Sequence, residues 1–81
     1  MVILIEFLGK QRLVTRASSI TMPLAEGARV TDALEYVRNQ YPTLQLNKDE
    51  VLITVNHEMA TPDKILSADD TVSFLPFIHG G

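Results

Sequence analysis

The chain opens with an almost unbroken apolar run, Val-Ile-Leu-Ile-Glu-Phe, over residues 2–7. Its branched side chains are typical of a strand that is covered on both faces or central in its sheet. A polar segment, Gly-Lys-Gln-Arg, follows over residues 9–12. We therefore predict a first strand over residues 2–7 that leads into a turn.

The next segment, residues 18–24, alternates between apolar and polar side chains. Alternation places Ile20, Met22 and Leu24 on one face of a strand. We predict a half-buried second strand here. Pro23 has no backbone N–H to donate, which favours an edge position for this strand.

A helical pattern comes after a turn over residues 25–28. Apolar residues recur at i, i+3, i+4 and i+7, namely Val30, Ala33, Leu34 and Val37. This spacing predicts an amphipathic helix that ends before Pro42. Thr31 is chemically the better capping residue. We favour a start at Arg29, because Asp32 then lies in the first turn, where the helix dipole favours an anion.

The second half of the chain predicts two more strands. One covers residues 51–56 and ends at Asn56, a residue that tolerates left-handed turn geometry. The last covers residues 71–77 and follows a tight turn at Asp69 and Asp70.

Between these two strands, residues 57–70 are interpreted as a long connection. We expect Met59, Ile65 and Leu66 to anchor it to the core. The order strand, strand, helix, strand, strand predicts an α+β fold of the ubiquitin-like β-grasp type, a mixed sheet with one main helix packed across one face. The first and last strands can pair in parallel, because the helix and its connections let the chain cross over. We expect a β-grasp domain over residues 1–76 and a flexible C-terminal tail over residues 77–81.

Length and charge narrow the function. The 81 residues make one small domain with a single core. Ten acidic and seven basic side chains give a net charge of −3, which argues against nucleic acid or an anionic membrane as the partner. Cysteine is absent, which excludes disulfides and thiolate metal sites. We expect a cytoplasmic protein, without a signal peptide or membrane helix, whose partners are proteins or small molecules.

Catalytic and metal-binding patterns are not found. His57 and His79 are the only histidines, and with Asp69 and Asp70 they show no known metal-ligand spacing. The serines lack a nearby histidine with an orienting partner. We predict no metal site and no turnover by the chain alone.

The final residues, Phe-Ile-His-Gly-Gly, are the feature that most suggests a function. Without a Cβ atom, Gly80 and Gly81 can lie extended in a channel too narrow for other residues. From Pro76 to Gly81 an extended chain reaches about 16 to 18 Å, enough to bring a terminal carboxylate into a partner's active site. That carboxylate is ionised at neutral pH, so it would need activation by ATP before sulfide or a persulfide could attack it. A frayed end is the alternative interpretation.

Several segments match the motifs of a known family. The last strand and tail, Asp-Asp-Thr-Val-Ser-Phe-Leu-Pro-Phe-Ile-His-Gly-Gly, resemble its Asp-x-Val, aromatic, proline and Gly-Gly pattern. Upstream, residues 26–34, Val-Asn at 55–56 and the Gly-Lys-Gln-Arg segment match further motifs. The chain thus resembles the MoaD/ThiS family of ubiquitin-like sulfur carriers, most closely the MoaD type, the small subunit of molybdopterin synthase. Phe77 stands where the family has a second proline, Asp69 where a glycine is common, and Arg29 where a threonine caps the helix.

This resemblance implies a specific chemistry at the tail. An E1-like adenylyltransferase of the MoeB/ThiF type, using ATP and Mg, would adenylate Gly81, and a sulfur donor protein would supply the sulfur of a thiocarboxylate. Gly80 would provide clearance. A large subunit of the MoaE type, in a heterotetramer with this chain, would use the sulfur to form the dithiolene of molybdopterin in molybdenum cofactor biosynthesis. The chain itself would bind no cofactor.

The resemblance also implies a docking surface on the sheet face away from the helix. Its expected residues are Phe7, Arg12, Phe74, Leu75, Pro76, Phe77, Ile78 and His79. Phe7 and Phe74 could instead be core residues, and Arg12 an ordinary solvated side chain. Phe77 and Ile78 lie at and beyond the end of the last predicted strand, which favours contact with a partner.

Three alternatives stay open. A ThiS-type carrier would use the same tail chemistry for thiazole in thiamine biosynthesis, although length and Pro76 favour the MoaD type. A ubiquitin-like modifier would join its tail to lysines of other proteins. A non-catalytic β-grasp interaction module would have an incidental tail.

Overall fold

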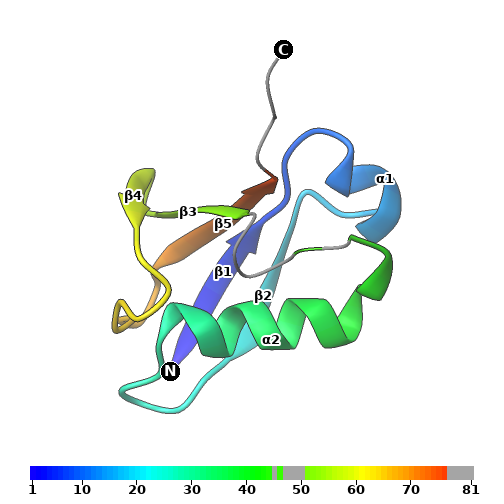
Figure 1. Ribbon diagram of the computed structural model, residues 1–81. Helices are drawn as coiled ribbons and strands as arrows, with labels where there is room; N and C mark the ends of the chain where they lie inside the picture. Colours follow the sequence, from blue (N-terminus) through cyan, green and yellow to red (C-terminus); the bar gives the residue numbers. More distant parts are fainter. Residues whose placement is uncertain (45, 47–50, 77–81) are drawn as a thin grey trace.

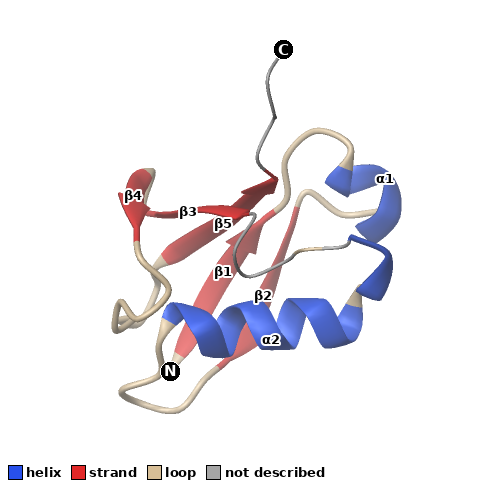
Figure 2. Ribbon diagram, in the orientation of Figure 1, coloured by secondary structure: helices blue, strands red, loops and turns tan. Residues whose placement is uncertain are grey.

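The computed structural model describes residues 1–44, 46 and 51–76 of the chain. Figure 1 shows the order of the helices and strands, and Figure 2 shows their arrangement around one sheet. The elements are β1 (Val2–Glu6), α1 (Gln11–Thr15), β2 (Ser19–Pro23), α2 (Val30–Gln40), the 3-10 helix η1 (Pro42–Leu44), β3 (Val51–Val55), β4 (Glu58–Ala60) and β5 (Thr71–Pro76).

The strands form a mixed sheet in the order β2-β1-β5-β3-β4. β1 and β5 pair in parallel, with Leu4 opposite Thr71, and the other neighbours pair antiparallel. The helix α2 crosses one face of the sheet (Figure 2). This arrangement confirms the predicted α+β architecture, the parallel pairing of the first and last strands, and the edge position of the strand that contains Pro23.

The long helix begins and ends where its pattern predicts. Arg29 is the N-cap, and its backbone N–H donates to the carboxylate of Asp32 at 2.8 Å. The Arg29 guanidinium reaches across to the carbonyl of Asp63 at 2.7 Å, a contact that a threonine at this position could not make. The helix ends at Gln40, before Pro42.

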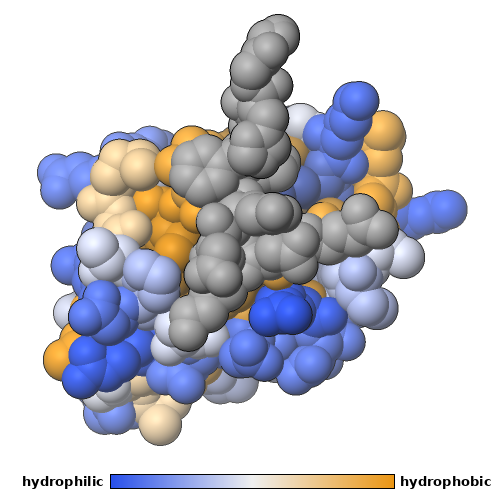
Figure 3. Space-filling model, viewed as in Figure 1, coloured by the Kyte–Doolittle hydropathy of each residue, from blue (hydrophilic) through white to orange (hydrophobic). Residues whose placement is uncertain are grey.

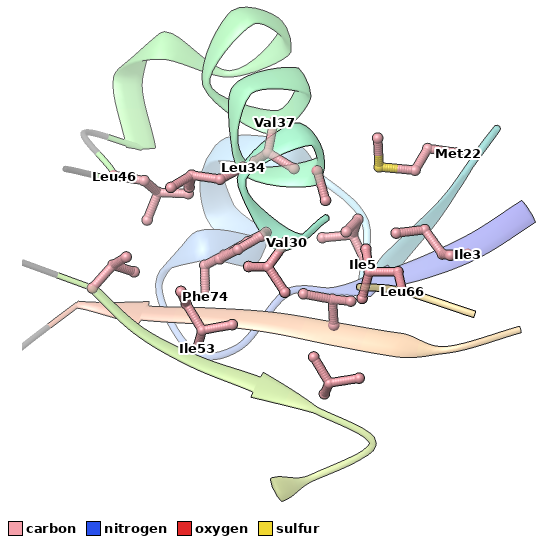
Figure 4. Packing of buried hydrophobic residues seen from close by; sticks show 14 of the residues in the cluster. Ile3, Ile5, Met22, Val30, Leu34, Val37, Leu46, Ile53, Leu66 and Phe74 are labelled. Atoms are coloured by element: carbon pink, nitrogen blue, oxygen red, sulfur yellow. The ribbon is translucent and has the colours of Figure 1, made fainter. Parts of the chain in front are cut away.

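The core lies between α2 and the sheet. Val30, Leu34 and Val37 point from the helix toward the strands, where Ile5, Ile53 and Phe74 meet them (Figure 4). Each of these six side chains is at most 3% exposed. Truncating a large side chain in such a core costs about 2 to 5 kcal/mol of unfolding free energy.

Three elements were not predicted, one of which is the short 3-10 helix η1 after α2. Residues 11–15 form the helix α1 in place of part of the expected turn, and residues 58–60 form the strand β4 inside the expected connection. β4 follows a two-residue turn in which Asn56 and His57 have φ values of 52° and 70°. Positive φ at both central residues is the geometry of a type I′ hairpin, which Asn-Gly signals clearly and Asn-His does not.

The burial pattern also corrects some expectations. Of the two predicted settings for the first strand, the position inside the sheet is confirmed, since β1 lies between β2 and β5. Coverage on both faces is wrong, because Ile3 and Ile5 are buried whereas Val2 is 49% exposed. Of the three expected anchors of the connection, only Leu66 is buried, at 3% exposed. Met59 and Ile65 are 67% and 54% exposed. The reason for Met59 is its place in β4, where it pairs with Thr54 and lies on the face of the sheet away from α2.

Candidate functional site: the open face and the end of the last strand

The last strand, β5, leads directly to the segment that the sequence singles out. It is flanked by β1 and β3 and ends at Pro76. The predicted reactive and clearance residues, Gly81 and Gly80, lie outside the described residues, as do the predicted contact residues 77–79. β5 and its neighbours therefore form the described part of the candidate site.

Two predicted docking residues belong to the core. Phe7 and Phe74 are each 2% exposed, and the Phe7 ring packs edge-on against Tyr41 at a centroid distance of 5.5 Å. Phe74 lies on the helix-facing side of β5 together with Val72. The alternative interpretation of both residues as core is therefore confirmed, and their assignment to an exposed docking surface is wrong. Alternate residues of a strand face the same side, so Phe74 follows Val72 into the core and Phe7 follows Ile3 and Ile5.

The opposite face of the sheet is not covered by any helix of the described chain (Figure 2). We call it the open face. By strand alternation and register it consists of Val2, Leu4, Glu6, Ser19, Thr21, Pro23, Leu52, Thr54, Met59, Thr71, Ser73 and Leu75. Leu75 of β5 lies opposite Leu52 of β3, and both are half-buried. A neighbouring apolar pair on an uncovered sheet can bury further area only against a partner.

Leu75 is thus the one predicted docking residue whose side chain is seen on the open face. Leu4, Leu52 and Met59 also contribute apolar surface there and were missed. The alternation of buried residues along β3 could have identified Leu52, since Val51, Ile53 and Val55 are all buried.

Pro76 ends β5 at a position where its missing N–H costs no hydrogen bond. It pairs with Val51 in the register of β3, two positions beyond the Ile53 and Phe74 pair. The backbone nitrogen of Pro76 points away from β3, toward the side of β5 where β1 lies. β1 has already ended at Glu6, so it does not reach this position. Proline is tolerated in a strand at such an unpaired position.

The helix α1 contributes side chains that reach the backbone near the end of β5. Arg12 is exposed, and its Nε donates to the carbonyl of Phe7 at 3.0 Å. Gln11 is 9% exposed and contacts the carbonyl of Phe74. Gln11 was missed as a site residue, because a glutamine in a polar segment carries no signal of burial.

The outer surface of α1 is apolar and basic. Leu13 is 78% and Val14 41% exposed, and Figure 3 shows hydrophobic atoms protruding over this helix. Lys10, Arg12 and Arg16 are exposed around them. This surface lies beside the end of β5, since Gln11 of the same helix contacts Phe74.

The pKa of Asp63 is lowered by its hydrogen bonds. The hydroxyl of Thr61 donates to Asp63 at 2.7 Å, and this bond, with a backbone hydrogen bond and the charge of Arg29, lowers the pKa of Asp63 below its usual 3.8. Asp63, Lys64 and Met59 line a shallow open depression beside β4.

Among the described residues no group of three or more His, Cys, Asp or Glu side chains could hold a metal ion. Within the same residues, no helix is both long enough and apolar enough to span a bilayer.

A family model for the ThiS family matches residues 5–81. The chain belongs to the ThiS family. This ThiS/MoaD-type family comprises ubiquitin-like sulfur carriers and modifiers. The match includes every residue of β5 and both final glycines.

Solved structures share the fold of this ThiS-family chain. SAMP1 from Haloferax volcanii is 19% identical, with 100% of both chains covered and a TM-score of 0.83. A Pyrococcus furiosus protein provisionally assigned as molybdopterin converting factor subunit 1 is 22% identical, with 95% of this chain and 98% of that chain covered and a TM-score of 0.81.

A third similar structure is a protein–protein complex. It contains subunits 1 and 2 of the molybdopterin-converting factor from Helicobacter pylori, and the similar chain is 18% identical, with 100% of both chains covered and a TM-score of 0.64. Likenesses at these identities establish the fold, and they confirm the predicted ubiquitin-like β-grasp. The curated proteins include no significant sequence match.

Proposed function

We propose that this ThiS-family chain is a sulfur carrier whose Gly81 carboxylate is converted to a thiocarboxylate, which donates sulfur to form the dithiolene of molybdopterin. The observation that carries the proposal is the ThiS-family match, which runs through Gly80 and Gly81. Further support comes from β5, the central strand of the sheet, which directly precedes the C-terminal segment, and from the apolar residues of the open face.

The chemistry requires activation of a weak electrophile. The ionised carboxylate would attack the α-phosphate of ATP and release pyrophosphate, which gives an acyl adenylate. Sulfide would then attack the carbonyl carbon and displace AMP, which leaves the thiocarboxylate. ATP and Mg belong to an E1-like adenylyltransferase of the MoeB/ThiF type. In the cell a sulfur donor protein supplies the sulfur, and we place the reaction in the cytoplasm.

The destination we favour is a large subunit of the MoaE type, in a heterotetramer with this chain. Support comes from the Helicobacter pylori neighbour, whose structure holds subunits 1 and 2 of the molybdopterin-converting factor together. Leu4, Leu52 and Leu75 of the open face supply apolar area of the kind that such interfaces bury. We propose that Phe77 and Ile78 contact the same partner.

A second candidate is conjugation to proteins. SAMP1, a small archaeal modifier protein, shares the fold along its whole length. Adenylation of the tail is the first step in both candidates. They separate afterwards, since a modifier forms an amide with a lysine whereas a carrier delivers sulfur.

The test begins with the purified chain, a cognate E1-like enzyme, ATP and sulfide. We expect intact-protein mass spectrometry to show one oxygen replaced by sulfur in the wild type and in Asn39→Ala, a change at an exposed position of α2 that keeps both glycines. Deletion of Gly81 should abolish the change. An unchanged wild-type mass with an active enzyme would contradict the proposal.

The destination is tested by giving the thiocarboxylated chain to each possible acceptor. Dithiolene formation with a MoaE-type subunit and a cyclic pyranopterin precursor would support the molybdopterin assignment. Thiazole formation with a thiazole synthase, or conjugation to lysines, would replace it with the ThiS-type or the modifier role.

A further inference from the structure

The parallel ladder between β1 and β5 ends before β5 does. Its last pair joins Glu6 to Ser73, whereas β5 continues to Pro76. The carbonyl of Asp70 accepts the N–H of Leu4 at 2.9 Å, so it faces β1. Because alternate peptide groups of a strand point the same way, the carbonyl of Phe74 also faces this side, one step beyond the last pair.

The side chain of Gln11 occupies the place where a further residue of β1 would pair. Its Nε2 donates to the carbonyl of Phe74 at 2.5 Å, and its Oε1 accepts the N–H of Leu8 at 3.1 Å. A carboxamide has the donor and acceptor of a peptide group. Gln11 therefore continues the ladder by one step, between the segment after β1 and the end of β5.

The surroundings hold this side chain in place. Gln11 is 9% exposed, which makes it one of two buried polar residues among those the structure describes. Its neighbour Arg12 fixes the same segment from the other side, through its bond to the carbonyl of Phe7. A buried hydrogen bond to the backbone resists rotation of the strand end, because breaking it leaves a carbonyl without a partner.

We propose that Gln11 is a positioning residue that sets the direction in which the chain leaves β5, and that it thereby lowers the entropy lost when the tail enters an activating enzyme. The inference rests on the proposed function for its kinetic consequence. Preorganisation acts on association, so loss of the Gln11 contacts raises KM for this chain as substrate and leaves kcat nearly unchanged.

Two substitutions separate the contacts from the shape of the side chain. Gln11→Met keeps the length and removes both hydrogen bonds. Gln11→Glu keeps an acceptor for Leu8 and removes the donor to Phe74, because an ionised carboxylate cannot donate. Gln40→Glu, at the exposed end of α2, is the matched control for the change of charge.

The experiment measures adenylation by an E1-like enzyme as a function of carrier concentration, corrected for the folded fraction of each variant. We expect both Gln11 variants, which share the loss of the bond to Phe74, to raise KM about tenfold, the equivalent of that one buried hydrogen bond, with kcat changed less than about twofold. Amide exchange should be faster at Leu8 in Gln11→Met and nearly unchanged there in Gln11→Glu. Gln40→Glu should match the wild type in both measurements.

The outcomes distinguish this inference from the proposed function. If the wild type is adenylated and the Gln11 variants have the KM of Gln40→Glu, Gln11 has a structural role only and the inference is overturned. Lower melting temperatures with an unchanged KM lead to the same conclusion. If an active enzyme does not adenylate the wild type, the proposed function fails, and the kinetic inference fails with it.

Discussion

The two faces of β5 differ in what covers them. Val72 and Phe74, at 0% and 2% exposed, lie under α2, whereas Leu75 faces the uncovered side and remains half-buried. The same six residues therefore stabilise the fold with one set of side chains and present another set to a partner. A change on one face should unfold the protein, and a change on the other should weaken binding.

The largest effect is expected from Phe74→Ala on the covered face. Removing this ring leaves a cavity between α2 and the sheet, and we expect the free energy of unfolding to fall by about 3 to 5 kcal/mol. Urea denaturation followed by circular dichroism measures the change. A loss below about 1 kcal/mol would show that Phe74 is not a core residue.

Leu75→Ala tests the open face of the same strand. We expect little loss of stability, about 1 kcal/mol or less, and about tenfold weaker binding to an E1-like enzyme or a MoaE-type subunit. Calorimetric titration measures the affinity. Ile65→Ala is the control, since Ile65 is 54% exposed but lies in the connection after β4, outside the open face. Equal affinities for Leu75→Ala and the wild type would exclude the open face as the docking surface.

A smaller effect is expected at Asn56 in the β3–β4 turn, whose side chain bonds to Asp70 and Thr71 at the start of β5 and belongs to neither face. The amide of Asn56 donates to Asp70 at 2.9 Å and accepts the N–H of Thr71 at 3.0 Å, with φ at 52°. We expect Asn56→Ala to cost about 1 to 2 kcal/mol of unfolding free energy. Asn56→Gly removes the same hydrogen bonds but adopts the left-handed backbone easily. A smaller loss of unfolding free energy in Asn56→Gly than in Asn56→Ala would therefore give the conformational part of the cost.

The smallest effect should come from Asp63, in the loop beyond β4. Its pKa is lowered mainly by the Thr61 hydroxyl, so its ionised form contributes stability above pH 3.8 that is lost as the pH falls through the lower folded-state pKa. Asp63→Asn should therefore be less stable than the wild type near pH 6, and the difference should shrink below pH 3.8. A difference in urea midpoint that does not change with pH would contradict this. We expect no effect of Asp63→Asn on partner binding.

Local patterns predicted the elements that the core stabilises. The apolar spacing from Val30 to Val37 identified α2, and the placement of Asp32 identified its start, because both patterns follow the burial that forms the helix. Strand alternation likewise placed Met22 on one face of a half-buried strand, and that side chain is buried. The missing N–H of Pro23 predicted the edge position of the same strand. These features are encoded by residues near one another in the chain.

Features that depend on long-range contacts were not predicted. α1 has no apolar stripe, and Gln11 reaches a carbonyl 63 residues away. Met59 is apolar but exposed, because β4 pairs at the edge of the sheet and turns it to the open face. Phe7 and Phe74 were predicted to be docking residues but are buried, for the same reason. Hydrophobicity alone does not determine which face of the sheet a side chain occupies.

The central claim is that sulfur is carried on the last residue of the chain. Tandem mass spectrometry of the C-terminal peptide, after reaction with an E1-like enzyme, ATP and sulfide, locates the added sulfur residue by residue. We predict that sulfur replaces one carboxylate oxygen of Gly81 and that no other residue changes mass. Sulfur at another position, or an unmodified peptide from a reaction in which ATP is consumed, would contradict it.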